Sequence, residues 1–282
     1  MAQRIGFLGP VGTYTEEAAL LFAAGQEGAA SVLQPFPSIP AVGSAVTSGS
    51  TELGVVPIEN SLEGSVNFTL DLLIGNPDLS IQNEVVVPID HYLMAKPGTA
   101  LSDIQVVYSH PQALAQCKEF LEQSMPSAQQ MASLSTVAAV ADMRTSSIPA
   151  AAISPRRAAD LNPDVEIIGR DIQDNPNNVT RFVVLALSDH GPTGNDKTSI
   201  CLSFQEVDAS GLLHSALGGF AQRSINLMKI ESRPTKQSLG EYIFLIDCAG
   251  HRQDPLLKDA LDSLSGISRM LKVFGSYPCW QP

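Results

Sequence analysis

Metal-binding and basic motifs are missing from this chain of 282 residues, and their absence excludes several functions. The four cysteines, Cys117, Cys201, Cys248 and Cys279, lie far apart and show no CxxC or Cys/His spacing. Zinc sites and redox motifs need such spacing, so we expect reduced thiols and no metal site. No run of lysine or arginine interrupts a formal net charge of −12, which would repel nucleic acid and anionic lipid.

Long apolar runs are missing as well. No stretch approaches the roughly 20 apolar residues that span a bilayer. The N-terminus enters a strand-like segment at Ile5 without the hydrophobic region of a secretory signal. We therefore expect a cytoplasmic protein without a membrane partner.

Composition and length favour a folded protein of two unequal domains. Hydrophobic residues make up 44% of the chain, enough for a substantial core. Residues 188–196 are polar, contain Gly and Pro, and separate two strongly β-like segments, which is typical of an interdomain linker. We place the first domain at residues 1–190 and the second at residues 197–280.

The first domain alternates short apolar runs with helical patterns, which predicts an α/β domain built on mostly parallel sheets. The expected strands are 5–8, 54–58, 81–87, 92–95, 105–108, 150–153 and 181–187. The expected helices are 15–24, 38–47, 66–74, 111–123 and 136–143. Thr13 followed by Glu16 fits a capping box at the first helix.

The second domain has a different order of elements. Strand 197–205 precedes helix 210–222, strands 225–232 and 240–248 follow, and helix 254–264 leads to strand 267–275. This order is βαββαβ, the plan of α+β ferredoxin-like domains.

The opening loop, Gly6-Phe-Leu-Gly9-Pro-Val-Gly12-Thr13-Tyr14, lies between a strand and a helix, as a nucleotide-binding loop would. Its glycines follow GxxGxxG rather than GxGxxG, and no carboxylate follows at the distance that would hold a ribose. A loop that presents backbone N–H groups to a small anion at a helix N-terminus needs only these turns. We therefore expect anion binding here and no nucleotide.

Four further segments occur in order along the first domain: Val56-Pro-Ile-Glu59-Asn60-Ser61-Leu-Glu-Gly64, Ser109-His110-Pro-Gln112, Ser135-Thr136-Val, and Asn175-Pro-Asn-Asn178-Val-Thr180-Arg181-Phe182. Together with the opening loop they resemble the prephenate dehydratases. The second domain resembles the regulatory ACT domain of these enzymes through Gly211-Leu-Leu213, Asn226-Leu227 and Glu231-Ser-Arg-Pro234. The resemblance covers nearly the whole chain, and five ordered motifs make it specific.

The resemblance implies a catalytic domain of two periplasmic-binding-protein-like (type II) subdomains with the active site between them. It also implies a carbon–oxygen lyase that needs no cofactor. Such an enzyme removes carbon dioxide and a hydroxyl group from prephenate, and the aromatic ring of phenylpyruvate supplies the driving force.

The resemblance also assigns catalytic residues. Thr180, in its Thr-Arg-Phe motif, best matches the proposed proton donor, with an ordinary strand residue as the alternative. Glu59 is a second candidate acid, whose proton a dianionic substrate would hold, with a helix-capping glutamate as the alternative. Asn60, Ser109 and Gln112 complete the expected catalytic set. The remaining family positions are expected to bind substrate: Thr13, Ser61, Ser135, Thr136, Arg181 and Phe182. Among them Arg181 is the expected anchoring cation.

Regulation is implied by the second domain. ACT domains pair side by side and bind an amino acid at their interface, so we expect a homodimer or homotetramer that phenylalanine regulates. The expected effector contacts are Gly211, Leu212, Leu213, Asn226, Leu227, Glu231, Ser232, Arg233 and Pro234. The family often has Gly-Ala-Leu where this chain has Gly211-Leu212-Leu213, which bears on the choice of effector.

Two other functions fit parts of the pattern. An arogenate dehydratase would act on a substrate with an amine in place of the keto group, and the motifs barely separate the two enzymes. A noncatalytic amino-acid sensor would bind phenylalanine without turnover, although a sensor does not need the Thr180-Arg181-Phe182 motif. Because the dehydratase motif starts at once, we expect no fused chorismate mutase.

Overall fold

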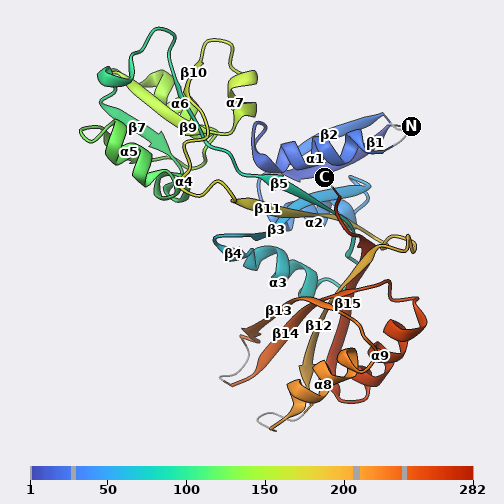
Figure 1. Cartoon of the computed structure of the whole chain (residues 1–282). Coiled ribbons are helices and arrows are strands. Elements are labelled where there is room, and N and C mark those ends of the chain that lie inside the picture. The colour runs from blue at the N-terminus through green and yellow to red at the C-terminus, as the bar shows by residue number, and fades with distance from the viewer. Residues whose placement is uncertain (1, 27–29, 206–209, 237–239, 282) are drawn as a thin grey trace.

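A computed structural model describes residues 2–26, 30–205, 210–236 and 240–281. Within them the chain forms three β-sheets, each belonging to a separate lobe in Figure 1. We call the lobes the first subdomain (residues 2–88 and 179–187), the second subdomain (residues 92–169) and the C-terminal domain (residues 196–281).

The first subdomain is a mixed sheet in the order β2-β1-β3-β11-β5, with β4 paired to β3. Its strands are β1 (Gln3–Leu8), β2 (Ser31–Phe36), β3 (Leu53–Asn60), β4 (Gly64–Ser65), β5 (Ser80–Pro88) and β11 (Val179–Ala186). Its helices are α1 (Tyr14–Ala24), α2 (Ile39–Thr47) and α3 (Asn67–Gly75). Apolar residues on both faces of the sheet form two cores, one of them against α1 and the other against α2 and α3.

The second subdomain has the sheet order β10-β6-β9-β7-β8. Its strands are β6 (Tyr92–Ala95), β7 (Val106–Ser109), β8 (Gln129–Ala132), β9 (Ala150–Ser154) and β10 (Glu166–Gly169). Its helices are α4 (Pro111–Gln116), α5 (Lys118–Ser124), α6 (Ala138–Thr145) and α7 (Arg156–Asp160), with a 3₁₀ turn at Leu101–Asp103. Residues 89–91 lead into this subdomain and residues 170–178 lead back, so two segments join the subdomains, as Figure 1 shows.

The expectation of mostly parallel sheets is wrong. In the first subdomain β1 is parallel to β2 and β3, but β11 is antiparallel to both β3 and β5. The physical reason is the route of the chain, which leaves the first sheet at the end of β5 and returns from the second subdomain beside that same strand end, where Val179 pairs with Pro88. A strand that re-enters there has to run in the opposite direction. In the second sheet β6 is likewise antiparallel to β9 and β10.

Several short elements differ from the expected pattern. Strands β2, β8 and β10 and helix α7 were not expected; β2 contains Pro35, and β8 is exposed along its whole length, as suits edge strands. The expected helix 111–123 is divided at Cys117, whose backbone is not helical. The second part begins where the Asp174 carboxylate accepts the Glu119 N–H at 3.1 Å.

The C-terminal domain confirms the βαββαβ order. Strands β12 (Asp196–Phe204), β13 (Leu227–Pro234), β14 (Tyr242–Ala249) and β15 (Ser268–Pro278) form an antiparallel sheet in the order β13-β14-β12-β15. Helices α8 (Leu212–Ala221) and α9 (Pro255–Ser265) pack on one face through a core that includes Phe220, Leu257 and Leu261.

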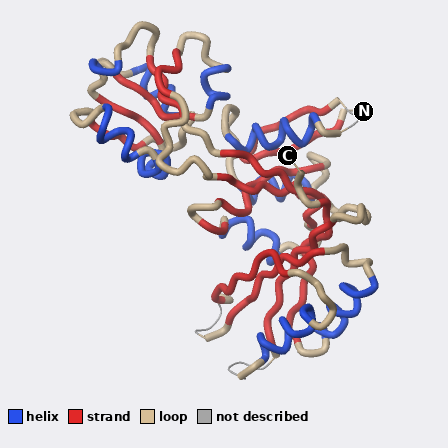
Figure 2. Tube along the Cα trace, in the orientation of Figure 1, coloured by secondary structure: helices blue, strands red, loops and turns tan. Residues whose placement is uncertain are grey.

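The opposite face of this sheet packs on the first subdomain, where β15 contacts β5. Figure 2, in the orientation of Figure 1, shows strands of the lowest lobe meeting those of the middle lobe. Cys201, Leu245, Phe274 and Tyr277 share one core cluster with residues of α2, α3 and the first sheet. No helix or strand occurs between Ala186 and Asp196, so this segment is a covalent linker. One apolar core nevertheless includes residues from both sides of this linker, so the C-terminal domain and the first subdomain share it.

Gly275 of β15 allows the closest approach between the two sheets. A β-carbon at this position would lie 2.1 Å from the Ile81 carbonyl oxygen of β5. We expect Gly275→Ala to push β15 away and to lower the free energy of unfolding by about 1–3 kcal/mol, as overpacking typically does. Urea unfolding measures this, and Gly191→Ala in the linker is the matched control because its β-carbon would meet nothing within 4 Å. Equal stability of the two variants would contradict close packing here.

Candidate active site

The pairing of β3 with β11 places Asn60 opposite Thr180. The Asn60 Nδ2 atom donates to Thr180 Oγ1 at 2.9 Å, and both side chains are buried. Because the asparagine supplies the proton of this bond, the hydroxyl proton of Thr180 is left to be donated elsewhere. The Asn60 Oδ1 atom accepts the N–H groups of Leu62 and Glu63, at 2.9 and 3.0 Å, and so fixes the turn that follows β3.

The hydrogen bonds continue from Asn60 into the second subdomain. Asn60 Nδ2 also donates to Asn178 Oδ1 at 2.8 Å, and Asn178 Nδ2 donates to Gln116 Oε1 at 3.2 Å. Gln116 ends α4, so this chain of amides crosses the junction between the subdomains. Gln116 Oε1 also lies 3.0 Å from His91 Nε2.

His91 lies at this junction with almost no exposure. Burial lowers its pKa, although the hydrogen bond to Gln116 opposes the shift. Its backbone N–H donates to Gln173 Oε1 at 2.9 Å, and the Tyr14 ring at the start of α1 meets its ring edge-on. The Tyr14 hydroxyl donates to the Asp90 carbonyl, so α1 and both connecting segments are held together here.

The opening loop reaches the same junction. Thr13 Oγ1 accepts the Glu16 N–H at 3.4 Å, while Glu16 Oε2 accepts the Gly12 N–H at 2.6 Å. The carboxylate thus reaches the residue before Thr13, one position from the expected capping box. Glu16 also pairs with Arg157 of α7 at 3.3 Å, and a β-carbon on Gly12 would lie 3.3 Å from Val137. The loop therefore contacts the second subdomain beside residues 135–137.

The other expected polar residues lie on both sides of the junction. Ser61 Oγ accepts the Val179 N–H at 3.0 Å and so joins the ends of β3 and β11. The Ser109 hydroxyl is fully buried and donates to the Ile153 carbonyl at 2.7 Å. Gln112 is exposed on α4, one turn before Gln116. Ser135 Oγ accepts the Ala138 N–H at 3.0 Å, and Thr136 is half-buried next to it.

Arg181 and Glu59 form the next pair of the same ladder, and their side chains turn to the opposite face of the sheet. Arg181 Nη2 lies 2.8 Å from Glu59 and 2.9 Å from Asp247 of the C-terminal domain. Its Nη1 lies 3.4 Å from Glu84, and only 11% of the side chain is exposed. Three carboxylates therefore already hold Arg181 in this structure, and its expected role as substrate anchor stays a prediction.

The expected acid role of Glu59 also stays a prediction, and the surroundings of Glu59 in this structure oppose it. Burial raises its pKa, but the charges of Arg181 and Lys229 outweigh burial and lower the pKa overall. A carboxyl group held ionised between two cations has no proton to donate near neutral pH. Burial likewise opposes the charge of Arg181, and its carboxylate neighbours, Asp247 foremost, raise its pKa overall.

Phe182 was expected to bind substrate, and this expectation also stays a prediction. Its side chain is 2% exposed and packs in the core beneath α1, against residues such as Phe7, Val85 and Val184. A ring enclosed in this way by apolar side chains presents no exposed surface to a ligand in this structure.

Sequence reasoning missed three members of the hydrogen-bond chain. Asn178 lay within a quoted motif but was not assigned a role, and Gln116 and His91 were not singled out. A signal for Gln116 existed, because it follows Gln112 by four residues on a helix and such residues share one face. No spacing pointed to His91, which reaches the site because the chain crosses to the second subdomain directly after β5.

The expected effector residues lie at both ends of the C-terminal sheet. Gly211 is the N-cap of α8 with a left-handed backbone, φ 86°, and half-buried Leu212 and Leu213 follow it. Asn226 is exposed and accepts the Ala249 N–H through its carbonyl, just before Leu227. Glu231 instead contacts Ser65, and Arg233 pairs with Asp71 at 2.5 Å; Ser232 and Pro234 are exposed. This segment therefore joins the C-terminal domain to the first subdomain.

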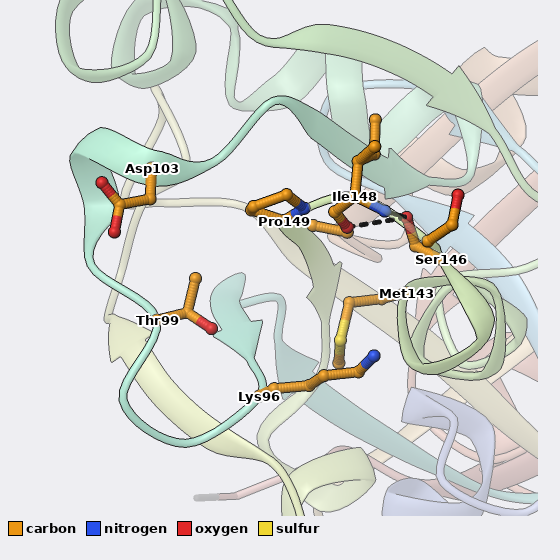
Figure 3. Close-up of a pocket in the computed structure, with 9 residues that line it drawn as sticks. Lys96, Thr99, Asp103, Met143, Ser146, Ile148 and Pro149 are labelled. Carbon is orange, nitrogen blue, oxygen red and sulfur yellow. Dashed lines mark hydrogen bonds between the residues drawn. The ribbon is translucent and has the colours of Figure 1, made fainter.

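A pocket of about 330 Å³ lies apart from this junction, in the second subdomain. Figure 3 shows Lys96, Thr99 and Asp103 on one side of it and Met143 and Pro149 on the other. Its remaining lining residues are Ser146, Ser147, Ile148 and Ala150. None of the residues singled out from the sequence takes part.

Burial raises the pKa of the Cys117 and Cys248 thiols to about 12 and that of Cys201 to about 11. These cysteines are unpaired and fully buried, so they act as small hydrophobic side chains.

Among the described residues, no group of His, Cys, Asp and Glu side chains is arranged to hold a metal ion. Nor do the helices of the described ranges include one long and apolar enough to span a membrane.

Family models match both parts of the chain. The model described as Prephenate dehydratase matches residues 5–190, and the model described as ACT domain matches residues 204–266. A bifunctional chorismate mutase/prephenate dehydratase from Aquifex aeolicus is 38% identical over 275 residues, which cover 98% of this chain and 73% of that one. A prephenate dehydratase from Bacillus subtilis is 34% identical over 287 residues, 99% of each chain.

Solved structures agree with these matches. Prephenate dehydratase from Arthrobacter aurescens, in complex with L-Phe, has a TM-score of 0.87 and 38% identity, covering 98% of this chain and 90% of that one. GqqA, described as a novel type of quorum quenching acylase, has a TM-score of 0.84 and 28% identity over 99% and 98% of the two chains. Because proteins described with two different activities share this fold, the activity of this chain has to be inferred from its site residues rather than from its fold.

The buried His91 gives the junction a testable pH dependence. Its pKa is lowered in the folded protein, so the unfolded chain binds the proton first as pH falls through the ordinary value of 6.5. We expect the free energy of unfolding to be highest above this pH and to decline below it. Urea unfolding between about pH 7.5 and 5.5 measures the slope, which should flatten in His91→Asn. The same slope in both proteins would mean that His91 titrates normally.

Proposed function

This chain belongs to the prephenate dehydratase family and carries an ACT domain, and we propose that it converts prephenate at the Asn60–Thr180 pair. The enzyme is a lyase that releases carbon dioxide and water and leaves phenylpyruvate. The electron pair of the breaking carbon–carbon bond enters the ring as the carbon–oxygen pair departs with the hydroxyl group. Electrons therefore move only within the substrate, and the protein has to supply a proton to the leaving oxygen.

The observation that carries the proposal is the direction of the Asn60–Thr180 hydrogen bond. Asn60 donates into Thr180 Oγ1, so the threonine hydroxyl has its own proton free for the leaving group. A hydroxyl that accepts one hydrogen bond donates a second one more strongly. The buried position excludes competing water, which strengthens the interaction further.

The substrate carboxylates are bound by uncharged groups in this proposal. The N-terminus of α1 at Thr13 and that of α6 near Ser135 and Thr136 approach the junction from the two subdomains. Backbone N–H groups at helix N-termini bind carboxylates through the helix dipole. Gln112 and Ser61 add exposed polar groups on either side. Arg181 and Phe182 have no part in this binding.

We further propose that phenylalanine binds the ACT domain, at the segments that begin at Gly211 and Asn226. The Arthrobacter relative was solved with L-Phe, and the same domain is present here. In this proposal two chains pair through the sheets of their ACT domains. Strand β13 is an edge strand of this sheet, and its residues Met228 and Ile230 are exposed.

The buried, unpaired cysteines fit a reducing cytoplasm.

Substitution of Thr180 tests the catalytic role. Thr180→Val keeps the shape but removes the proton, and we expect kcat on prephenate to fall about 100-fold or more, with KM little changed. Thr180→Ser keeps the hydroxyl and should stay within about ten-fold of the parent. Phenylpyruvate formation measures both. A valine variant as active as the serine variant would remove Thr180 from the chemistry.

Titration with phenylalanine tests regulation. We expect bound phenylalanine to change the apparent affinity for prephenate by about 5- to 150-fold, the factor that corresponds to typical coupling energies of 1–3 kcal/mol. Asn226→Ala should shift the midpoint to higher concentration. Turnover that stays flat into the millimolar range would indicate a folded but insensitive ACT domain.

A further inference from the structure

The sheet of the C-terminal domain, which contains the ACT match, contacts the β3–β11 ladder on the face opposite to Asn60 and Thr180. The adjacent ladder pair, Glu59 and Arg181, points away from the proposed site toward the C-terminal domain. Each member meets an ACT residue: Lys229 of β13 lies 3.0 Å from Glu59, and Asp247 of β14 lies 2.9 Å from Arg181. One ACT contact thus reaches each of the two strands that carry the proposed site.

Further hydrogen bonds fix these two ACT residues. Ser199 of β12 donates to Asp247 Oδ1 at 2.6 Å, and its oxygen also lies 2.6 Å from the hydroxyl of buried Tyr277. Lys229 donates to Ser65 of β4 at 2.6 Å, and Ser65 in turn donates to Glu231. The cations and carboxylates are partly or fully enclosed, so each geometry depends on its partners.

We propose that Lys229 and Asp247 are positioning residues for the dehydratase reaction, acting through Glu59 and Arg181 on the Asn60–Thr180 pair. This inference rests on the proposed catalytic role of Thr180. Loss of Lys229 or Asp247 removes one ion-pair partner from Glu59 or Arg181, respectively. The remaining partly buried charge then moves toward its other partners, and the β3–β11 ladder shifts with it. A displacement of under an ångström at Thr180 weakens proton donation but leaves carboxylate binding elsewhere unchanged.

Another contact between the same domains provides a matched control. Asp71 of α3 pairs with Arg233 and Lys236 of the ACT domain, at 2.5 and 2.7 Å. These pairs tie the domains together, and none of the three residues is bonded to Glu59 or Arg181. Asp71→Asn removes the same charge as Asp247→Asn, so it reports the cost of weaker docking alone.

The experiment compares steady-state kinetics of the full-length parent, Lys229→Met, Lys229→Arg, Asp247→Asn and Asp71→Asn on prephenate without phenylalanine. We expect kcat to fall about ten-fold in Lys229→Met and Asp247→Asn while KM stays within about two-fold, the split typical of lost positioning. Lys229→Arg keeps a cation beside Glu59 and should recover most of kcat. Asp71→Asn should match the parent.

Two outcomes would overturn the inference: parental kcat in both Lys229→Met and Asp247→Asn, or an equal loss in Asp71→Asn, which would assign the effect to docking in general. Circular dichroism checks folding, and if Asp247→Asn does not fold, the two lysine variants decide. A parent protein that does not turn over prephenate would instead refute the proposed function.

Discussion

The antiparallel pairing of β3 with β11 is the constraint on which this structure depends. Strand β11 is the last strand of the first sheet in sequence, and it follows all the strands and helices of the second subdomain. Its insertion between β3 and β5 closes the sheet and brings Thr180 opposite Asn60. The same insertion draws residues 170–178 across the junction, where Asn178 meets Gln116. One strand pairing therefore closes the core and assembles the proposed site.

The two faces of this ladder have separate tasks because successive strand residues point in opposite directions. Thr180 and Asn60 face the junction with neutral hydrogen-bonding partners, which suits a site for a doubly negative substrate. Arg181 and Glu59 face the ACT sheet, where fixed charges bind each other rather than a ligand. Placing the cations behind the site also avoids overbinding the ring carboxylate, which has to leave as carbon dioxide.

The sequence predicted the elements well where the apolar periodicity was strong, as in β1, β3, β5, β11 and the whole βαββαβ domain. It did not predict edge strands such as β2, which contains Pro35, and β8, which is exposed at every residue. Motifs located Asn60 and Thr180, but motif membership does not tell which face of a strand a side chain occupies. Arg181 and Glu59 lie on the opposite face from Thr180, where Asp247 and Lys229 pair with them. Phe182 shares the face of Thr180 but is covered by the core beneath α1. These neighbours come from distant segments, which the motifs do not reveal.

The most direct measurement of the central claim is a crystal structure with a stable cyclohexadiene dicarboxylate that mimics prephenate. The account predicts that the oxygen corresponding to the leaving hydroxyl lies about 2.6–3.0 Å from Thr180 Oγ1. Arg181 should remain paired with Glu59 and Asp247 in that complex. A ligand whose carboxylate binds Arg181, or one that sits away from Thr180 and Asn60, would contradict it.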